Sequence, residues 1–351
     1  MCLLSVLAVV LAVASTRAQD NVVRLLTHDS FNVSEQVLAD FERESGLTVE
    51  IVRLGDAGLL VNQAILTREN PLGDVLYGID NTFLSRAFDA DLFSPYRSSA
   101  LDLSDSPYVD PSDTQARVTP IDYGDVCLNY DVAYFAERDL ALPETLIDLT
   151  TPEYAGLLVV QNPATSSPGL AFLLATIAVF GELDDYTYLD YWRDLVANDV
   201  LIADDWTDAY YGQFSGSAGS TGDRPLVISY ASSPPVEVYF ADPPLARGEP
   251  APTGAIVTPD TCFRQIEYAG VLVNAANPVG AEKLIDFLLS ESFQEDIPLQ
   301  MFVYPIHPDA DLPDVFLDYS TAPEQPVTLD SAVIDAGRDG WIAAWTDAIL
   351  R

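Results

Sequence analysis

Segments typical of β-strands and of α-helices alternate along the first part of the chain. Strands are expected at residues 22–27, 47–53 and 74–79, and helices at residues 34–45, 59–68 and 82–88. Ser34 is placed to cap the first of these helices and Gly46 to end it. This β-α-β-α-β order predicts an α/β fold with a mostly parallel, doubly wound sheet. Ligands of such sheets bind beyond the carboxyl ends of the strands.

The stretch from Thr119 to Tyr130 separates this block from a second one. It contains a strand at residues 126–130, and Asp122-Tyr-Gly124 is expected to form a turn that leads into it. In the second block, strands are expected at 157–161 and 225–230, helices at 170–180 and 183–198, and a proline-rich loop at 242–259. Residues 262–274 form another long apolar strand, and helices are expected at 278–289 and 331–350. Trp341 and Trp345, four residues apart on the last helix, are expected in the core.

Two strands that pass between two α/β blocks predict two lobes joined by two crossovers. The first lobe would comprise residues 20–121 together with 270–351, and the second lobe residues 125–267. Because binding sites cluster at domain interfaces, a ligand cleft is expected between the lobes.

The chain begins with the pattern of a signal peptide at residues 1–18. Residues 3–14 are apolar, and Thr16-Arg17-Ala18 is a tolerable cleavage site. The apolar run is shorter than the roughly 20 residues that span a membrane. The pattern predicts an exported protein, located in the periplasm or at the outer face of the cell membrane.

The chain is strongly acidic, with 54 Asp and Glu against 16 Lys and Arg and a net charge of −38. Nucleic acid is not expected as a partner, because phosphate binding needs basic residues. A negative field attracts cations. An acidic surface also keeps a protein soluble, and this general reading is the stronger one for the charge as a whole.

Two cysteines remain after the signal peptide, Cys127 and Cys262. In an oxidising compartment they suggest one disulfide. The alternative is a reactive thiol.

Polar and aromatic residues follow several expected strands. Asp29, Ser30, Asp80 and Asn81 lie at strand ends, and Asp122 lies at the crossover. Carboxylates gathered in one cleft suit a cationic ligand, whereas each acid taken alone is more readily explained as a solvated loop residue in a chain this acidic. Ser166 or Ser167 is expected to cap the helix that follows, and a helix start also favours an anion. Loop aromatics beside carboxylates suit a flat heterocycle or a cation, and the alternative for each is packing at the end of an element. They are Trp206, Tyr210, Tyr211, Tyr230, Phe302 and Tyr304.

The sequence indicates no metal site and no cofactor. His28 and His307 are the two histidines, and they do not have the spacing of metal ligands. The chain has no Gly-x-Ser-x-Gly, Walker or Gly-x-Gly-x-x-Gly sequence.

A series of short motifs, taken in order, resembles the thiamine-binding proteins of bacterial ABC importers. The motifs are Thr27-His-Asp-Ser-Phe31, Gly78-Ile-Asp-Asn81, Ile121-Asp-Tyr-Gly124, Asn162-Pro-Ala-Thr-Ser-Ser-Pro-Gly-Leu170, Asp205-Trp-Thr-Asp-Ala-Tyr210, Ser229-Tyr-Ala-Ser-Ser-Pro234, Ile297-Pro298, Tyr304-Pro305 and the pair Trp341 and Trp345. The resemblance covers nearly the whole mature chain. It implies a type II periplasmic-binding-protein fold of two lobes with two crossovers. It also implies binding of thiamine or its phosphates and delivery to a membrane permease by a monomer.

The resemblance also implies roles for particular residues. Asp29 and Ser30 match the family's first binding loop, Asp80 and Asn81 match its second, and Trp206 and Tyr230 match ring-contacting aromatics. Ser166, Ser167 and Gly169 match the loop that holds the hydroxyethyl or phosphate end of the ligand. Phe302 stands where a stacking tryptophan is usual, and His28 replaces a tyrosine. The full expected ligand-binding set is His28, Asp29, Ser30, Asp80, Asn81, Asp122, Tyr123, Ser166, Ser167, Gly169, Trp206, Tyr230, Ser232, Ser233, Phe302 and Tyr304.

Three readings remain open for the function. The first is binding without chemistry. The second is a thiamine-cleaving enzyme of similar fold, with Cys127 as nucleophile and Glu267 as base, which requires a free thiolate. The third is a binder of another cation, either a polyamine or ferric iron. Thiamine itself fits carboxylates, aromatic rings and a helix start, because it joins a fixed positive charge, a flat ring and a polar tail.

Overall fold

A computed structural model describes residues 21–183, 185–246 and 248–351. The expected signal peptide at residues 1–18 lies outside this part of the chain. Within it, no helix has the length and apolar character needed to cross a membrane.

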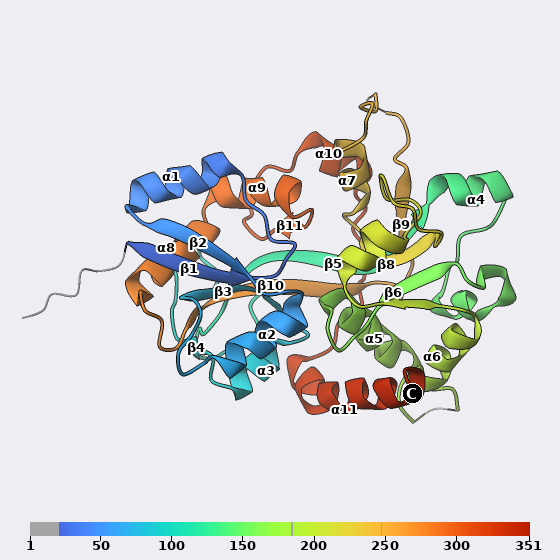
Figure 1. Ribbon diagram of the computed structural model, residues 1–351, viewed down its shortest axis with the longest axis horizontal. Helices are drawn as coiled ribbons and strands as arrows, with labels where there is room; N and C mark the ends of the chain where they lie inside the picture. Colours follow the sequence, from blue (N-terminus) through green and yellow to red (C-terminus); the bar gives the residue numbers. More distant parts are fainter. Residues whose placement is uncertain (1–20, 184, 247) are drawn as a thin grey trace, which may run out of the picture.

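The strands form one continuous sheet in the order β2-β1-β3-β10-β5-β8-β6-β7, with β4, β9 and β11 attached to the two central strands (Figure 1). Strands β1, β2 and β3 are parallel to one another, as are β6, β7 and β8, while the central strands β5 and β10 are antiparallel to each other. The strands are β1 (Val22–Thr27), β2 (Thr48–Arg53), β3 (Val75–Asp80), β4 (Phe93–Ser94), β5 (Thr119–Asp131), β6 (Leu158–Gln161), β7 (Leu201–Ala203), β8 (Leu226–Tyr230), β9 (Thr253–Ile256), β10 (Phe263–Leu272) and β11 (Tyr304–Pro305).

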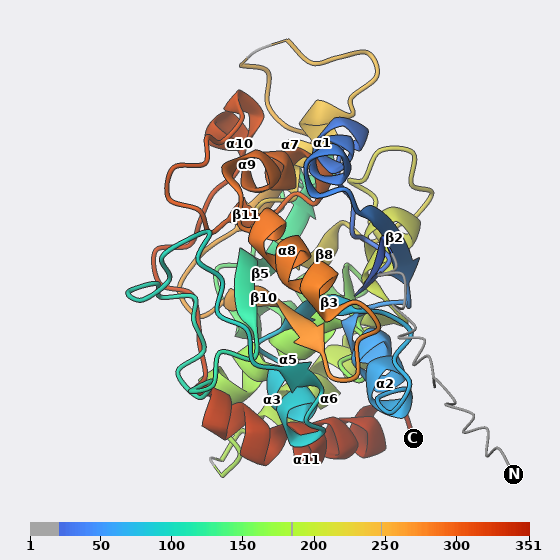
Figure 2. The same ribbon diagram turned by 90° about the vertical axis from the view of Figure 1, so that its left-hand side faces the viewer.

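Helices cover both faces of the sheet, as Figure 2 shows from the side. The α-helices are α1 (Glu35–Ser45), α2 (Ala57–Leu66), α3 (Leu84–Asp89), α4 (Val132–Arg138), α5 (Ser167–Phe180), α6 (Tyr188–Ala197), α7 (Pro234–Tyr239), α8 (Pro278–Leu288), α9 (Glu291–Gln300), α10 (Asp314–Tyr319) and α11 (Ser331–Ile349). Short 3₁₀ turns η1 (Leu146–Thr150) and η2 (Pro152–Tyr154) and a π-helical turn η3 (Asp208–Gln213) complete the list. This is the two-lobed α/β architecture that the sequence predicts, with β5 and β10 as its two crossover strands.

The first expected helix forms as its end signals predict. The hydroxyl of Ser34 accepts a hydrogen bond from the N–H of Val37, and Gly46 ends α1 with a φ of 71°. Phe41 is the buried residue of this helix and stacks on Phe287 of α8. The capping hydroxyl and the left-handed glycine thus fix both ends of the helix.

The expected turn at Asp122-Tyr-Gly124 is wrong, because these residues lie inside β5. Their pairing with β10 is continuous from Val126 to Asp122. A Cβ at Gly124 would lie 2.6 Å from the ring of Tyr230. The glycine therefore makes room for a neighbouring ring within a strand, a role that sequence alone does not separate from a turn.

Strand β9 is a second correction, because it lies in the stretch expected to be a proline-rich loop. It pairs antiparallel with β5, with Leu128 opposite Ile256. The strand has four residues and includes Gly254, so its sequence carries little strand signal.

The hydroxyls of Ser166 and Ser167 do not cap α5. Ser166 occupies the N-cap position but makes no side-chain capping hydrogen bond, and the helix begins at Ser167. The Ser167 hydroxyl donates to Asp80 instead. The partner of the Ser167 hydroxyl is thus the buried Asp80 carboxylate and not the backbone of the helix.

Helix α11 contacts elements of both lobes. It packs against α3, where Arg338 donates to Ser85, and against α6, where Trp345 meets Trp192 edge to face at 5.3 Å. Trp341 and Trp345 are buried, as expected. Because α11 packs against elements expected in both lobes, it marks no boundary between them. The residue bounds of the lobes therefore stay a prediction.

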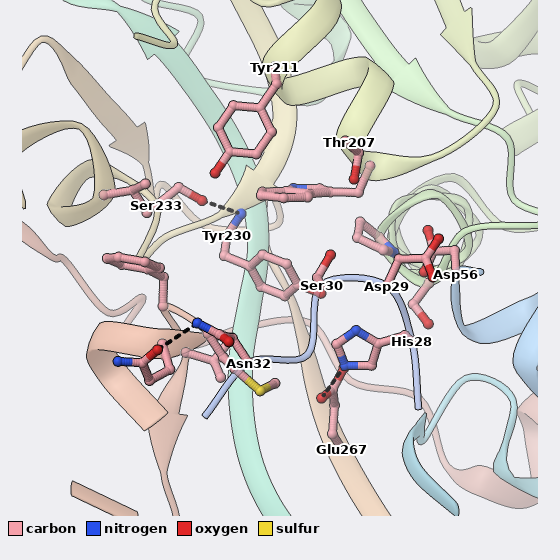
Figure 3. A pocket seen from close by; sticks show the side chains of 18 of the residues that line it. His28, Asp29, Ser30, Asn32, Asp56, Thr207, Tyr211, Tyr230, Ser233 and Glu267 are labelled. Carbon is pink, nitrogen blue, oxygen red and sulfur yellow. Dashed lines mark hydrogen bonds and ion pairs between the residues drawn. The ribbon is translucent and has the colours of Figure 1, made fainter. Parts of the chain in front are cut away.

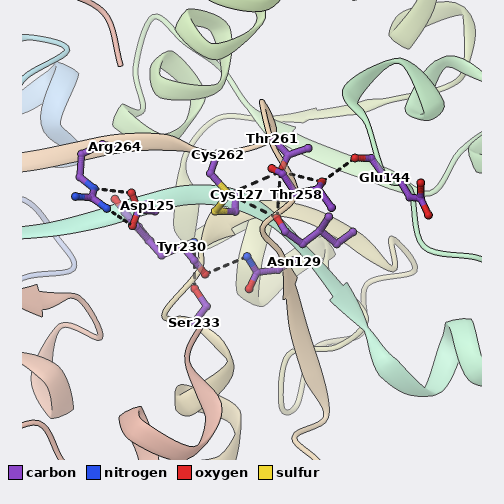
Figure 4. Close-up of a disulfide and its surroundings, with 11 residues drawn as sticks. Asp125, Cys127, Asn129, Glu144, Tyr230, Ser233, Thr258, Thr261, Cys262 and Arg264 are labelled. Carbon is purple, nitrogen blue, oxygen red and sulfur yellow. Dashed lines mark hydrogen bonds and ion pairs between the residues drawn. A yellow bond between two sulfur atoms is a disulfide. The ribbon is translucent and has the colours of Figure 1, made fainter. Parts of the chain in front are cut away.

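A disulfide joins the two crossovers. Cys127 in β5 and Cys262, directly before β10, are bonded with a Cα–Cα distance of 4.3 Å, which confirms the expected pairing (Figure 4). Close by, Arg264 of β10 forms a two-pronged ion pair with the buried Asp125 of β5. A covalent bond and a charged pair therefore hold the central strands in register.

Replacing both cysteines by alanine should destabilise the fold by about 3–5 kcal/mol, because the bond closes a loop with a sequence separation of 135. Urea unfolding of the oxidised wild type and the double variant measures the difference. Reduced wild type is the matched control and should resemble the variant. Equal midpoints for oxidised and reduced protein would contradict a stabilising role for the bond.

Candidate functional site

A pocket of about 560 Å³ lies between the lobes, beside the crossovers (Figure 3). One wall comes from the loops that follow β1 and β2, and the opposite wall from the start of α5, η3 and the β8–α7 turn. The end of α9 with the loop after it, helix α7 with the residue after it, and the crossover residue Glu267 complete the lining. The lining residues are His28, Asp29, Ser30, Asn32, Asp56, Ala57, Ser167, Pro168, Trp206, Thr207, Tyr211, Tyr230, Ser233, Val236, Tyr239, Phe240, Glu267, Leu299, Gln300, Met301, Phe302 and Val303.

Two neighbouring loops present carboxylates to the pocket. The Asp29 carboxylate accepts the N–H of Gly55 at 3.1 Å, and the Asp29 N–H donates to the Gly55 carbonyl at 3.0 Å. Asp56 follows and caps α2 by accepting the N–H of Ala57. The two acids lie close together at one end of the pocket (Figure 3). Parallel strands thus bring residues from separate loops to one place, as the carboxyl ends of such strands do.

His28 and Glu267 form an ion pair at the floor of the pocket, with Nε2 and Oε2 3.5 Å apart. A Cβ at Gly78 would lie 2.1 Å from the His28 ring, so the glycine in β3, with φ at +96°, leaves space for it. Burial lowers the pKa of His28, but Glu267, Asp56 and Asp29 together outweigh burial and raise it. The His28 ring therefore lies among three carboxylates that favour its protonated form.

Two further carboxylates lie beneath the lining. Asp80 accepts from Ser167 and Thr82, and Asp122 accepts from Tyr77. Burial raises the pKa of Asp80 to about 6, against the effect of its hydrogen bonds. Burial and nearby Glu267 also raise the pKa of Asp122. Both side chains are fully buried and neither lines the pocket, so neither is placed to contact a ligand.

Aromatic rings form the other end of the pocket. Trp206 stacks on Tyr210 at 5.0 Å and donates its Nε1–H to Ser229. Tyr211 meets the same indole edge to face at 5.4 Å. One face of Trp206 is thus covered by Tyr210 while its side chain lines the pocket. Such a ring is available to stack a flat ligand.

The pKa of Tyr230 reflects the acids around the pocket. Burial raises the pKa of its hydroxyl, and Glu267, Asp56 and Asp80 raise it further. No lysine or arginine is among the described residues that line the pocket. The pocket is therefore negative at one end and aromatic at the other.

Half of the expected binding residues line this pocket. They are His28, Asp29, Ser30, Ser167, Trp206, Tyr230, Ser233 and Phe302. Asp80 and Asp122 lie beneath it, as described above. The hydroxyl of Ser166 is fully buried beside Asp56, whose pKa it helps to lower against the larger effect of burial.

Five expected residues have other structural roles. The amide of Asn81 bonds the backbone of Arg264 and Ile266. Gly169 lets α5 approach β6, since its Cβ would lie 2.6 Å from the Gln161 carbonyl. The Ser232 hydroxyl donates to the Phe302 carbonyl at 2.7 Å. Tyr123 and Tyr304 stack at 5.3 Å and line a different pocket of about 590 Å³.

Several pocket residues are missing from the expected set. Asp56 lies in the short connection between β2 and α2, and Asp80 and Asn81 lie at the corresponding end of β3, so the position of Asp56 was a usable signal. From the sequence, Glu267 is expected only as the base of a thiamine-cleaving enzyme. Tyr239 and Phe240 belong to the short helix α7 and the residue after it, and nothing local in their sequence marks them as pocket residues.

The enzyme reading loses its candidate nucleophile. Cys127 is bonded to Cys262, is 1% exposed and does not line the pocket, so it is no free thiolate. Across the described ranges, no group of three or more His, Cys, Asp or Glu is arranged to hold a metal ion.

Changing Glu267 to Gln should reverse the pKa shift of His28, because burial then dominates. In the wild type, the raised pKa gives stability that is fully present below about pH 6.5 and is lost as pH rises through the folded pKa. The variant should therefore be destabilised most at pH 5.5. At pH 8.5 the loss should shrink, because removing Glu267 also relieves Asp80 and Asp122.

NMR titration of the histidine rings and urea unfolding between pH 5.5 and 8.5 test this expectation. His307 does not line the pocket and serves as the internal control. An unchanged His28 titration in the variant, or a destabilisation that grows with pH, would contradict the ion pair.

Known proteins show the same architecture and similar sequences. A thiamine-binding periplasmic protein of Escherichia coli is 28% identical, with 94% of each chain covered, and that of Brucella suis is 26% identical, with 99% of this chain and 97% of the relative covered. A solved periplasmic thiamin binding protein superposes with a TM-score of 0.79 at 27% identity, over 94% of this chain and 96% of that chain. The names of these relatives describe binding proteins. The family model for bacterial extracellular solute-binding proteins matches residues 70–322. The chain belongs to the bacterial extracellular solute-binding proteins.

Proposed function

We propose that this protein binds thiamine between its lobes, without chemistry, and delivers it to the permease of an ABC importer. The observation that carries the proposal is the pocket with carboxylates at one end and aromatic rings at the other. Thiamine joins a permanently positive thiazolium to a flat aminopyrimidine, so each half matches one end of the pocket. The names of the similar proteins support the same ligand and a place in the periplasm.

In this proposal the thiazolium lies near Asp29, Asp56 and Glu267. These three carboxylates and His28 give that end a formal charge of about −2 when the histidine is protonated. Their attraction for a cation is stronger than in bulk water, because the surroundings are partly dry. Ser30 is exposed to the pocket and offers a hydroxyl to the polar parts of the ligand.

The pyrimidine ring lies among Trp206, Tyr230 and Phe302. The indole of Trp206 is fixed by its hydrogen bond and by Tyr210, so stacking on it costs little side-chain entropy. Phe302 has a φ of 55° and stacks on Phe316 at 6.3 Å. Ser232 supports this aromatic wall from the other lobe by binding the Phe302 carbonyl.

Calorimetry with thiamine tests the function, with spermidine as the competing cation. Replacing Asp29 and Asp56 by Asn together should weaken thiamine by about tenfold or more, since each charge-assisted contact is worth about 1.5–3 kcal/mol. Asn at position 56 preserves helix capping. Glu137→Gln in α4, an exposed acid outside the pocket, is the matched control and should bind like wild type. Saturable binding of spermidine without binding of thiamine would show that the ligand is a polyamine and not thiamine.

Recovery of the ligand separates binding from cleavage. Thiamine incubated with the protein and then released by denaturation should be recovered intact by chromatography. A product that appears with turnover would establish the enzyme reading.

Thiamine should also close the lobes around the pocket. The two crossover strands offer a hinge, and two-lobed binding proteins of this architecture close by hinge motion. Small-angle scattering should give a smaller radius of gyration with saturating thiamine than without it. The same radius in both samples, at a concentration where calorimetry shows saturation, would contradict closure.

A further inference from the structure

His28 is the one side chain among the described lining residues of the pocket that can carry a positive charge. The residue is 8% exposed, and its ring meets the ring of Tyr77 edge to face at 6.4 Å. Gly78 leaves the space that the imidazole occupies. These contacts hold the ring at the floor of the pocket, beside the carboxylate of Glu267.

The ion pair between His28 and Glu267 is loose. The 3.5 Å between Nε2 and Oε2 is longer than an ordinary hydrogen bond. Among the described residues, neither atom has another hydrogen-bond partner. Glu267 lines the pocket, and the pair lies at its floor (Figure 3). The Glu267 oxygen can therefore accept a second positive group without giving up a strong hydrogen bond.

The charged groups that act on His28 are acids. Glu267 of β10, Asp56 after β2 and the neighbouring Asp29 all favour the protonated ring, and together they outweigh the opposite effect of burial on its pKa. Four further titratable groups interact electrostatically with one or more of these acids. They are Tyr77 and Asp80 on β3, Asp122 on β5 and Tyr230 on β8. The imidazolium is therefore stabilised by the same carboxylates that suit a cationic ligand.

Resting on the proposed function, we infer that His28 is a titratable counter-ion of Glu267 which a cationic ligand displaces, so that binding releases a proton. A ligand cation beside Glu267 and a charged imidazole place two positive charges close together in partly dry surroundings, which favours loss of the imidazolium proton. That proton passes from the ring to the buffer. The positive charge of the ligand takes its place, so the net charge of the site is kept.

The affinity for a cationic ligand should then rise with pH. At a pH below the pKa of His28 in the complex, the ring is protonated with and without ligand, and binding does not depend on pH. Between this pKa and the higher one of the free protein, each unit of pH strengthens binding by up to about tenfold, because up to one proton is released. At still higher pH the affinity reaches its plateau.

Calorimetry with thiamine in two buffers that differ in their heat of protonation counts the released protons. At about pH 7 the wild type should release about half to one proton per thiamine. Asp80, with a pKa of about 6, is by then mostly ionised and contributes little. In NMR spectra at the same pH, thiamine should move the His28 ring signals from their protonated toward their neutral positions.

His28→Gln removes the titrating ring and keeps a polar side chain. In this variant the proton release should fall close to zero, and the dissociation constant should lose its dependence on pH between about 7 and 8.5. His307→Gln is the matched control, because His307 lines a different pocket. It should release as many protons as the wild type.

The outcomes separate the inference from the function on which it rests. Thiamine binding without proton release, or with a His28 titration that the ligand leaves unchanged, would overturn the inference and leave thiamine binding in place. The NMR titration uses the wild type, so it decides even if His28→Gln does not fold. Release that persists in a folded His28→Gln variant would assign the proton to another group, such as Asp122, and would also overturn it. Absence of thiamine binding would overturn the proposed function and the inference together.

Discussion

The pairing of β5 with β10 is the contact on which the rest of the structure depends. Every other segment of the sheet attaches to one of these two strands, directly or through a neighbour. The disulfide between Cys127 and Cys262 and the ion pair between Asp125 and Arg264 fix their register. Because β10 carries Glu267 and β5 carries Gly124, the same register places a carboxylate at the pocket floor and leaves space for the ring of Tyr230. Fold and site are thus set by one antiparallel pair.

The concentration of acids near this pair has an energetic consequence. Buried carboxylates lose hydration, and at neutral pH that loss weakens the folded state where no positive partner compensates it. Asp80 and Asp122 have raised pKa values for this reason. A bound cation restores the missing partner, so ligand binding should add more stability than its contacts alone suggest. The site is in this sense prepared for positive charge.

Much of the architecture could be predicted from local signals, but only half of the predicted binding residues line the pocket. The first three strands and the Ser34 cap follow from patterns that neighbouring residues determine, and the disulfide follows from the two cysteines that remain after the signal peptide. Gly124 suggests a turn because a glycine's local preference says nothing of a ring that approaches from another strand. Tyr123 and Tyr304 have the right residue type for a ligand contact, yet they stack at 5.3 Å and line a different pocket. Which side of the crossover a residue faces depends on register and on partners distant in sequence.

Helix α11 adds a mechanical consequence to this picture. Below the sheet it contacts α3 of one lobe and α6 of the other, and its Trp341 and Trp345 belong to a hydrophobic core that both lobes share (Figure 1). On the pocket side, the lobes touch through the Ser232–Phe302 hydrogen bond and the rings of Tyr239, Phe240 and Phe302. Separating the shared core would expose far more apolar surface than separating this rim. The lobes should therefore separate at the aromatic rim of Tyr239, Phe240 and Phe302, while the shared core around α11 stays intact.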